Sequence, residues 1–177
     1  MRIIRGTHRG RKITPPANLP VRPTTDLAKE SLFNILDNHL YFEDLRVLDL
    51  YAGTGSISYE FASRGSSLVI AVDINPRCIG YISETSKKLG FDNLRAVRSS
   101  SIGFLGYCRE KFDVIFADPP YDLEGIEEVV SLVFGRDLLV EGGWLIIEHP
   151  QEKDFSAFAG FYQHRNYGKV NFSFFRK

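Results

Sequence analysis

The motif Asp118-Pro119-Pro120-Tyr121 follows an apolar run at residues 112–117 that we interpret as a buried strand. Polar groups at the carboxyl end of such a strand stand at the sheet edge where α/β folds bind ligands. The Asp118 carboxylate accepts hydrogen bonds, the prolines stiffen the turn, and Tyr121 offers a flat amphipathic ring. Together these groups predict a pocket that holds a planar amine. The alternative interpretation is an ordinary turn between a strand and a helix.

A glycine-rich loop forms a second candidate site. Residues 46–51 have the pattern of a core strand, and Gly53 and Gly55 follow it where helical spacing begins. The next apolar run, residues 68–72, ends in Asp73 and completes a βαβ unit. Glycines after a strand, with an acidic residue about twenty positions later, are typical of a nucleotide-binding loop.

The dinucleotide form of this loop would place a third glycine where this chain has Ser58. S-adenosylmethionine (SAM) has no pyrophosphate and requires only a close approach to the loop backbone, and Asp73 would accept from its two ribose hydroxyls. Asp49 could orient the loop or contact the amine of the cofactor. The predicted cofactor-binding residues of this region are Asp49, Ala52, Gly53, Thr54, Gly55 and Asp73.

Charge is distributed unevenly, although 22 basic and 22 acidic residues give a formal net charge of zero. Residues 1–25 hold six basic residues and no acid, a charge of +6, and the remainder holds 16 basic and 22 acidic residues, a charge of −6. A basic segment on an acidic body predicts an arm that binds a polyanion, although a solvated terminus can have the same composition. The six residues are Arg2, Arg5, Arg9, Arg11, Lys12 and Arg22.

Turn signals separate this arm from the body. Segments 2–5 and 11–13 bracket two glycines and predict a β-hairpin, with Ile3 on one face and the arginines largely on the other. The proline-rich stretch that follows predicts an extended linker. We therefore predict a basic arm for a polyanion over residues 1–20 and a single domain over residues 21–177.

The body begins with a predicted helix that runs to about Leu40. Thr24, Thr25 and Asp26 are all suitable N-caps for it, and a polar helix N-terminus can also hold a phosphate. Beyond the βαβ unit, the pattern predicts alternating strands and helices of an α/β domain, with a turn at Gly142-Gly143. These elements are a strand at 94–98, a helix at 102–109, a strand at 112–117, a helix at 124–134, a strand at 144–148 and a hairpin of strands 161–167 and 170–175.

Composition excludes several classes of protein. The chain has 177 residues, enough for one domain with a proper core, and Cys78 and Cys108 form no motif for a disulfide framework or a metal. The four histidines show no metal-ligand spacing, and no apolar stretch is long enough for a signal sequence or a membrane span. We expect a cytoplasmic protein with no metal and no membrane, acting as a monomer.

Motifs along the chain resemble those of the RsmD family, the 16S ribosomal RNA guanine-N2 methyltransferases. They occur in order from the first residue to the Asp118 motif, and the amino-terminal ones are the most specific. The matching motifs are Met1-Arg2-Ile3-Ile4, Arg9-Gly10-Arg11-Lys12, Arg22-Pro23-Thr24-Thr25-Asp26, Glu30-x-Leu32-Phe33-Asn34, Leu48-Asp49, Ala52-Gly53-Thr54-Gly55 and Asp118-Pro119-Pro120-Tyr121.

This resemblance implies a Rossmann-like, class I SAM-dependent methyltransferase with a seven-stranded, mostly parallel sheet of order 3-2-1-4-5-7-6 and a basic N-terminal β-hairpin arm. It implies that Asp118, Pro119, Pro120 and Tyr121 are catalytic, and that Ser100 lies against the adenine of SAM. The implied substrate is ribosomal RNA, free or in a small-subunit particle. The residues expected to bind RNA are Arg2, Arg5, Arg9, Arg11, Lys12, Arg22, Thr24 and Thr25.

Four other functions fit parts of the pattern. A DNA adenine-N6 or cytosine-N4 methyltransferase would share the Asp118 motif but usually has a separate target-recognition region. A protein glutamine methyltransferase would more typically have Asn in place of Asp118. A nicotinamide-dependent oxidoreductase would require the third glycine, and a non-catalytic RNA-binding module would require neither the glycine loop nor Asp118.

Overall fold

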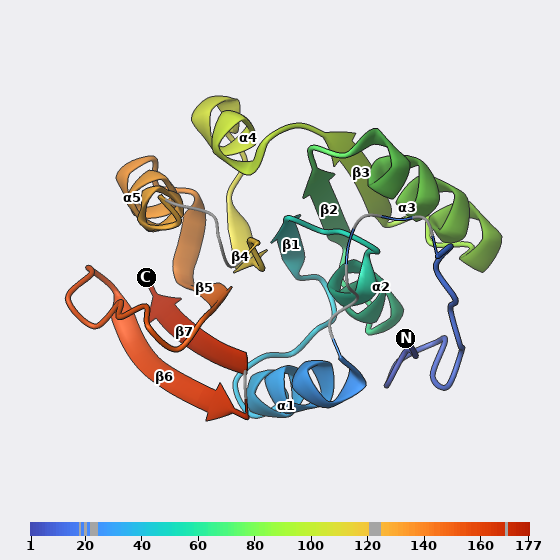
Figure 1. Cartoon of the computed structure of the whole chain (residues 1–177), viewed down its shortest axis with the longest axis horizontal. Coiled ribbons are helices and arrows are strands. Elements are labelled where there is room, and N and C mark those ends of the chain that lie inside the picture. The colour runs from blue at the N-terminus through green and yellow to red at the C-terminus, as the bar shows by residue number, and fades with distance from the viewer. Residues whose placement is uncertain (18, 20, 22–24, 121–124, 169) are drawn as a thin grey trace.

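The apolar runs of the sequence pair into one seven-stranded sheet in the computed structural model (Figure 1). The structure describes all residues except 18, 20, 22–24, 121–124 and 169. The strand order β3-β2-β1-β4-β5-β7-β6 confirms the predicted order. Strands β1 to β5 are parallel, and β7 pairs antiparallel with β5 and β6. Their bounds are β1 Arg46–Leu50, β2 Leu68–Asp73, β3 Leu94–Arg98, β4 Phe112–Ala117, β5 Leu139–His149, β6 Phe161–Tyr167 and β7 Val170–Arg176.

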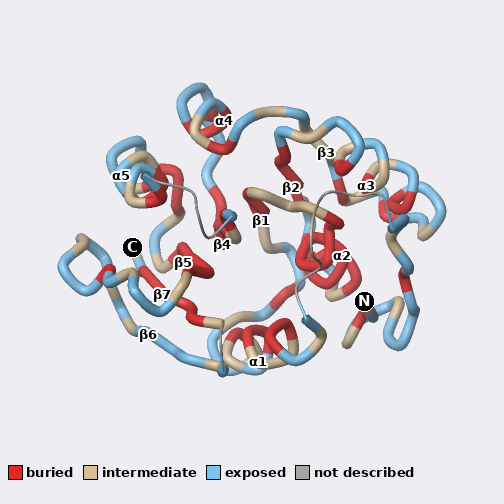
Figure 2. Tube along the Cα trace, viewed as in Figure 1, coloured by how far each residue is buried: buried red, intermediate tan, exposed pale blue. Residues whose placement is uncertain are grey.

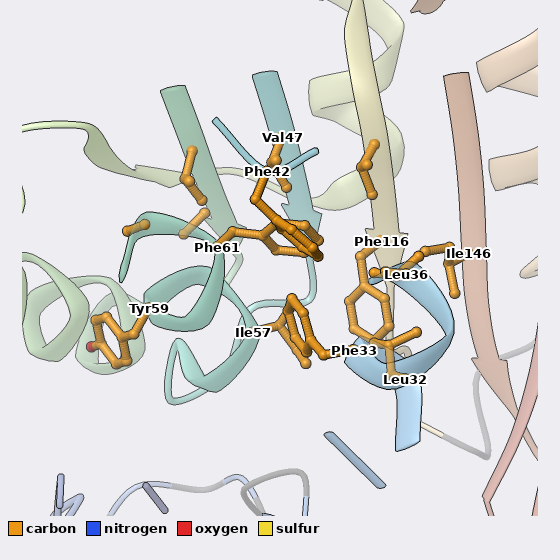
Figure 3. Packing of buried hydrophobic residues seen from close by; sticks show 14 of the residues in the cluster. Leu32, Phe33, Leu36, Phe42, Val47, Ile57, Tyr59, Phe61, Phe116 and Ile146 are labelled. Carbon is orange, nitrogen blue, oxygen red and sulfur yellow. The ribbon is translucent and has the colours of Figure 1, made fainter. Parts of the chain in front are cut away.

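Helices cover both faces of this sheet and enclose two apolar clusters. Helices α1, α2 and α3 pack on one face, where Phe33, Phe116 and Ile146 meet (Figure 3). Helices α4 and α5 pack on the other face. Figure 2 shows that burial is concentrated in the central strands and on the inward sides of the helices, while β6 is largely exposed. The helices are α1 Asp26–Leu36, α2 Ser56–Ser63, α3 Pro76–Leu89, α4 Ser101–Tyr107 and α5 Glu127–Gly135.

Local sequence signals fix the ends of several helices. Asn75 caps α3 by accepting from the Arg77 amide, Pro76 is its first residue, and Gly90 ends it with a φ of 68°. Helix α1 ends at Leu36, four residues before the predicted Leu40, because residues 37–40 form hydrogen-bonded turns instead of continuing the helix. Helix α4 likewise ends two residues earlier than predicted.

Strand β5 is longer than predicted, and the prediction of a turn at Gly142-Gly143 is wrong. Both glycines lie inside β5, which begins at Leu139, and the register with β4 shifts between Phe112 and Val114. Gly142 has a φ of 75°, and a Cβ on Gly143 would lie 2.9 Å from the Val140 carbonyl oxygen. The glycines therefore accommodate an irregularity of the strand, which sequence spacing does not distinguish from a turn.

The N-terminal hairpin, residues 1–13, folds against the domain. A single antiparallel bridge joins Arg2 and Lys12, and the Ile3 amide donates to the Arg11 carbonyl over 3.0 Å. Ile3 and Ile13 are buried in the core cluster of α1 and α2, while Arg2 and Arg11 remain exposed. Ile3 is therefore buried and the arginines of the hairpin are exposed, and the buried isoleucines attach the hairpin to the body.

No helix in the described part of the chain has the length and apolar character required to cross a bilayer. Among the same residues, no three His, Cys, Asp or Glu side chains gather as metal ligands would.

Candidate active site

Strands β1 and β4 are neighbours in the sheet, and the chain leaves them in opposite directions. After β1 it passes through α2 to β2 on one side, and after β4 it passes through α5 to β5 on the other. The Asp118 amide donates to the Leu50 carbonyl over 3.4 Å, so Asp118 lies directly beside the end of β1. Open α/β sheets bind ligands at such a reversal of strand order, and both candidate motifs of the sequence meet there.

The glycine loop turns tightly between β1 and α2. Gly53 and Gly55 have φ values of 55° and 79°, a region that side chains disfavour, and the Gly55 amide donates to the Ala52 carbonyl over 2.7 Å. A Cβ on Gly55 would lie 2.9 Å from the Tyr59 ring. Gly55 is therefore required here by its positive φ and by close packing against Tyr59. Binding of a cofactor by Gly53 and Gly55 stays a prediction. Thr54, also in the predicted set, is buried, and its hydroxyl lies 3.5 Å from the Met1 sulfur.

Asp73 holds this loop in place. One carboxylate oxygen accepts from the Gly53 amide over 2.8 Å, and the other accepts from the Asn75 amide over 2.7 Å. Each oxygen can accept a further hydrogen bond. The residues therefore fit SAM, since Asp73 places carboxylate oxygens beside the bare backbone of Gly53. Acceptance from the ribose hydroxyls stays a prediction.

Asp49 is buried beneath the loop, and the Ser58 hydroxyl donates to its carboxylate. Ser58 occupies the position of the missing third glycine, and sequence analysis gave it no role. Burial raises the pKa of Asp49 to about 7, and the neighbouring Asp118 carboxylate also raises it. Of the two predicted roles, the contact with Ser58 supports orientation of the segment that follows the loop.

The Asp118 motif continues β4 by one residue and then leaves the sheet. Asp118 is half-buried, Pro119 is buried and Pro120 is exposed, and burial raises the pKa of the Asp118 carboxyl to about 7. A carboxyl group with such a pKa exchanges its proton near neutral pH, which is typical of functional sites. Tyr121, the fourth predicted catalytic residue, lies outside the described residues.

Ser100, predicted to face the adenine, is the N-cap of α4. Its hydroxyl oxygen accepts from the Gly103 amide over 3.1 Å. This capping role explains the residue structurally, and contact with the adenine stays a prediction.

The predicted RNA-binding cations divide into two groups. Arg2 and Arg5 form ion pairs with Glu30 and Asp37, each at 2.8 Å. The remaining hairpin cations, Arg9, Arg11 and Lys12, are exposed, and no acid of the described chain lies within ion-pair distance of them. Arg22 and Thr24 lie outside the described residues, and Thr25 caps α1 by accepting from the Ala28 amide over 3.2 Å.

Sequence analysis missed two buried charged residues that connect the hairpin to the loop. Lys29 of α1 donates to the Arg2 carbonyl over 2.6 Å and to the Ser56 hydroxyl over 3.2 Å. Glu60 of α2 accepts from the amides of Ile4 and Arg5 over 2.8 and 3.0 Å. Burial lowers the pKa of Lys29, and the Glu60 carboxylate opposes that shift. The only sequence signal for their burial was position, because Lys29 follows Ala28 and Glu60 precedes Phe61, both apolar residues on the buried faces of their helices.

Side chains near the carboxyl end of the chain have structural roles. His149 is buried, and its Nε2 lies 2.8 Å from the Ser173 hydroxyl. Phe172, Phe174 and Phe175 are completely buried in the two core clusters.

Comparisons with known proteins agree with this geometry. A family model described as Conserved hypothetical protein 95 matches residues 1–176. Ribosomal RNA small subunit methyltransferase D of Escherichia coli strain K12 is 32% identical over 148 residues, which are 84% of this chain and 71% of that protein. Hypothetical protein TTHA0928 of Thermus thermophilus superposes with a TM-score of 0.86 at 25% identity, covering 99% of this chain and 98% of its own. SMU.776, a structure complexed with SAH, shares the fold with a TM-score of 0.66 at 18% identity, covering 86% of this chain and 50% of its own.

Proposed function

Because this chain belongs to the Conserved hypothetical protein 95 family, the RsmD family, we propose that it transfers a methyl group from SAM to the N2 amine of a guanine in 16S ribosomal RNA. Relatives named ribosomal RNA small subunit methyltransferase D support the substrate, and a fold neighbour complexed with SAH supports the cofactor. The observation that carries the proposal is the position of Asp118 beside Leu50, the last residue of β1, from which the glycine loop begins.

The chemistry of the amine explains the choice of residues. The lone pair of a guanine N2 amine is delocalised into the ring, so the amine is a poor nucleophile. Acceptors that bind its two hydrogens favour a tetrahedral nitrogen and direct the lone pair toward the methyl donor. We assign these acceptors to the Asp118 carboxylate and the Pro119 carbonyl, with Tyr121 stacking on the base.

Positioning supplies much of the proposed rate enhancement. SAM, when bound, supplies an electrophilic methyl group on its sulfonium. In this proposal Gly53 and Gly55 leave room for SAM, Asp73 accepts from its ribose hydroxyls, and the Asp118 motif holds the base opposite. The guanine must be unstacked or flipped out of the RNA to reach this position.

The pH dependence of the reaction follows from Asp118. Only the ionised carboxylate is a pure acceptor, and burial raises its pKa to about 7. We expect kcat/KM to rise as pH increases through about 7 and to level off above it. In Asp49→Asn, removal of the neighbouring charge should move the midpoint to lower pH. A profile that is flat between about pH 5.5 and 8.5 would contradict the role of Asp118.

RNA binding is assigned to the unpaired hairpin cations. Replacing Arg9, Arg11 and Lys12 together with alanine should weaken RNA binding by about 10-fold or more at low salt and reduce the salt slope by about 2 to 3. The control variant replaces Lys87, Lys88 and Arg95, which removes the same charge from α3 and β3. Electrophoretic mobility shifts over a salt series measure both. Equal losses in the two variants would mean that overall charge, and not the hairpin, determines affinity.

The direct test of the proposed function is methyl transfer from radiolabelled SAM. The substrates are RNA and small-subunit particles from cells that lack this gene, followed by nucleoside analysis. We expect label in N2-methylguanosine. Label in adenine or in protein would retain the fold and overturn the substrate, and no label despite SAM binding would favour a non-catalytic RNA-binding module. We further propose that the protein acts as a monomer in the cytoplasm, without a metal.

A further inference from the structure

Four neighbouring strands carry an acidic residue at their carboxyl ends, on the same face of the sheet. Side chains alternate between the two faces along a strand. Each of these acids lies two positions after an apolar residue of the core cluster on the α1 to α3 face. The pairs are Val47 and Asp49, Ala71 and Asp73, Phe116 and Asp118, and Ile146 and Glu148. Figure 3 shows Phe116 and Ile146 near one another on this face of the sheet.

Three of these carboxylates have been described above. Asp49 binds Ser58, Asp73 binds the glycine loop, and Asp118 is assigned to the N2 amine. The fourth, Glu148, belongs to β5, the strand beside β4, and is 6% exposed. Its place in the sheet indicates what it could bind.

The sheet register places Glu148 level with Asp118. Ala117 pairs with Ile147 in the parallel ladder of β4 and β5. The residues that follow them, Asp118 and Glu148, therefore stand side by side, since neighbouring strands lie about 4.8 Å apart. On its other side Glu148 pairs with Phe172 of β7, which is completely buried. The carboxylate thus lies between Asp118 and an apolar wall, where hydrogen bonds are stronger than in water.

Guanine offers two kinds of donor along one edge: the N2 amine and the adjacent N1–H. We propose that Glu148 determines base specificity by accepting the N1–H, while Asp118 accepts from the N2 amine beside it; this rests on the proposed function. Adenine has an acceptor at N1, so a carboxylate there repels it. A site that hydrogen-bonds one group rejects an analogue that lacks it, because the acceptor then loses the bond that the correct base would make.

The base 2-aminopurine separates the two contacts. It keeps an amine at C2 that can receive a methyl group, but its N1 is an acceptor. We expect the natural enzyme to prefer guanine over 2-aminopurine by about 100-fold in kcat/KM. In Glu148→Gln, the amide can donate to N1 of 2-aminopurine and no longer repels it, so this preference should fall to about 10-fold or less.

The experiment uses small-subunit particles reconstituted with ribosomal RNA in which the guanine methylated by the natural enzyme is kept or replaced by 2-aminopurine. The natural enzyme, Glu148→Gln and the control Glu152→Gln, an exposed glutamate in the turn that follows β5, are compared for kcat/KM on both particles and for SAM affinity. We expect SAM affinity within about twofold in all three and a changed base preference in Glu148→Gln alone.

Three results would overturn the inference. One is a natural enzyme that uses both bases equally, which needs no variant to observe. Another is an unchanged preference in Glu148→Gln, which would assign the N1–H to a different residue. The third is loss of SAM binding in Glu148→Gln, since a residue that touches only the base leaves the cofactor site intact. Failure of the proposed function is distinct, because the natural enzyme would then form no N2-methylguanosine on the guanine particle.

Discussion

Asp118→Ala is expected to reduce kcat by about 1,000-fold or more and to leave SAM affinity within about threefold. The carboxylate is the acceptor that activates the amine, whereas the backbone contact between the Asp118 amide and Leu50 survives the substitution. The glycine loop is held by Asp73, so the cofactor site does not depend on the Asp118 side chain. Single-turnover methyl transfer and calorimetry with SAM measure the two effects separately.

Asp118→Asn is the matched variant for this test. The amide keeps an acceptor oxygen and the shape of the side chain, so it should retain more activity than alanine. The rise of kcat/KM through a pH of about 7 should disappear in it, because the amide does not titrate. Near-normal turnover in Asp118→Ala would contradict the assignment of the catalytic acceptor.

Glu60→Ala is expected to lower the free energy of unfolding by about 3 to 5 kcal/mol. Glu60 is completely buried, and it accepts from two hairpin amides and from Nε of Arg64 over 2.8 Å. The Arg64 side chain is 5% exposed, so the substitution leaves a buried guanidinium with Asp37 as its remaining ion-pair partner in the described chain. Urea unfolding followed by circular dichroism gives the value.

Glu84→Ala is the control for Glu60. Glu84 also pairs with a basic residue four positions later, Lys88, but both side chains are largely exposed. Such surface pairs contribute little to stability, because solvent and salt screen the two charges. Similar losses in the two variants would mean that the buried bonds of Glu60 do not fasten the hairpin. Earlier proteolytic cleavage within residues 1–13 is expected in Glu60→Ala alone.

The sequence by itself determined the local elements and the two motifs of the site. Alternating apolar runs identified the strands, and glycines after the first strand with an acid after the second identified the candidate cofactor loop, because both signals depend on residues close in the chain. The strand order came from the family resemblance and is confirmed. Gly142 and Gly143 show the limit of local signals, since glycine pairs occur in turns and in strand irregularities alike.

Only the tertiary structure determined which residues distant in the sequence are in contact. Glu60 and Lys29 fasten the hairpin through bonds to residues 27 to 56 positions away. Arg9, Arg11 and Lys12 of that hairpin have no acid within ion-pair distance among the described residues. The register of β4 and β5 placed Glu148 level with Asp118, although the two residues are far apart in the chain. Burial then raised the pKa of the Asp118 carboxyl. Packing and dielectric environment arise from the whole fold, and for that reason no pattern of neighbouring residues could predict them.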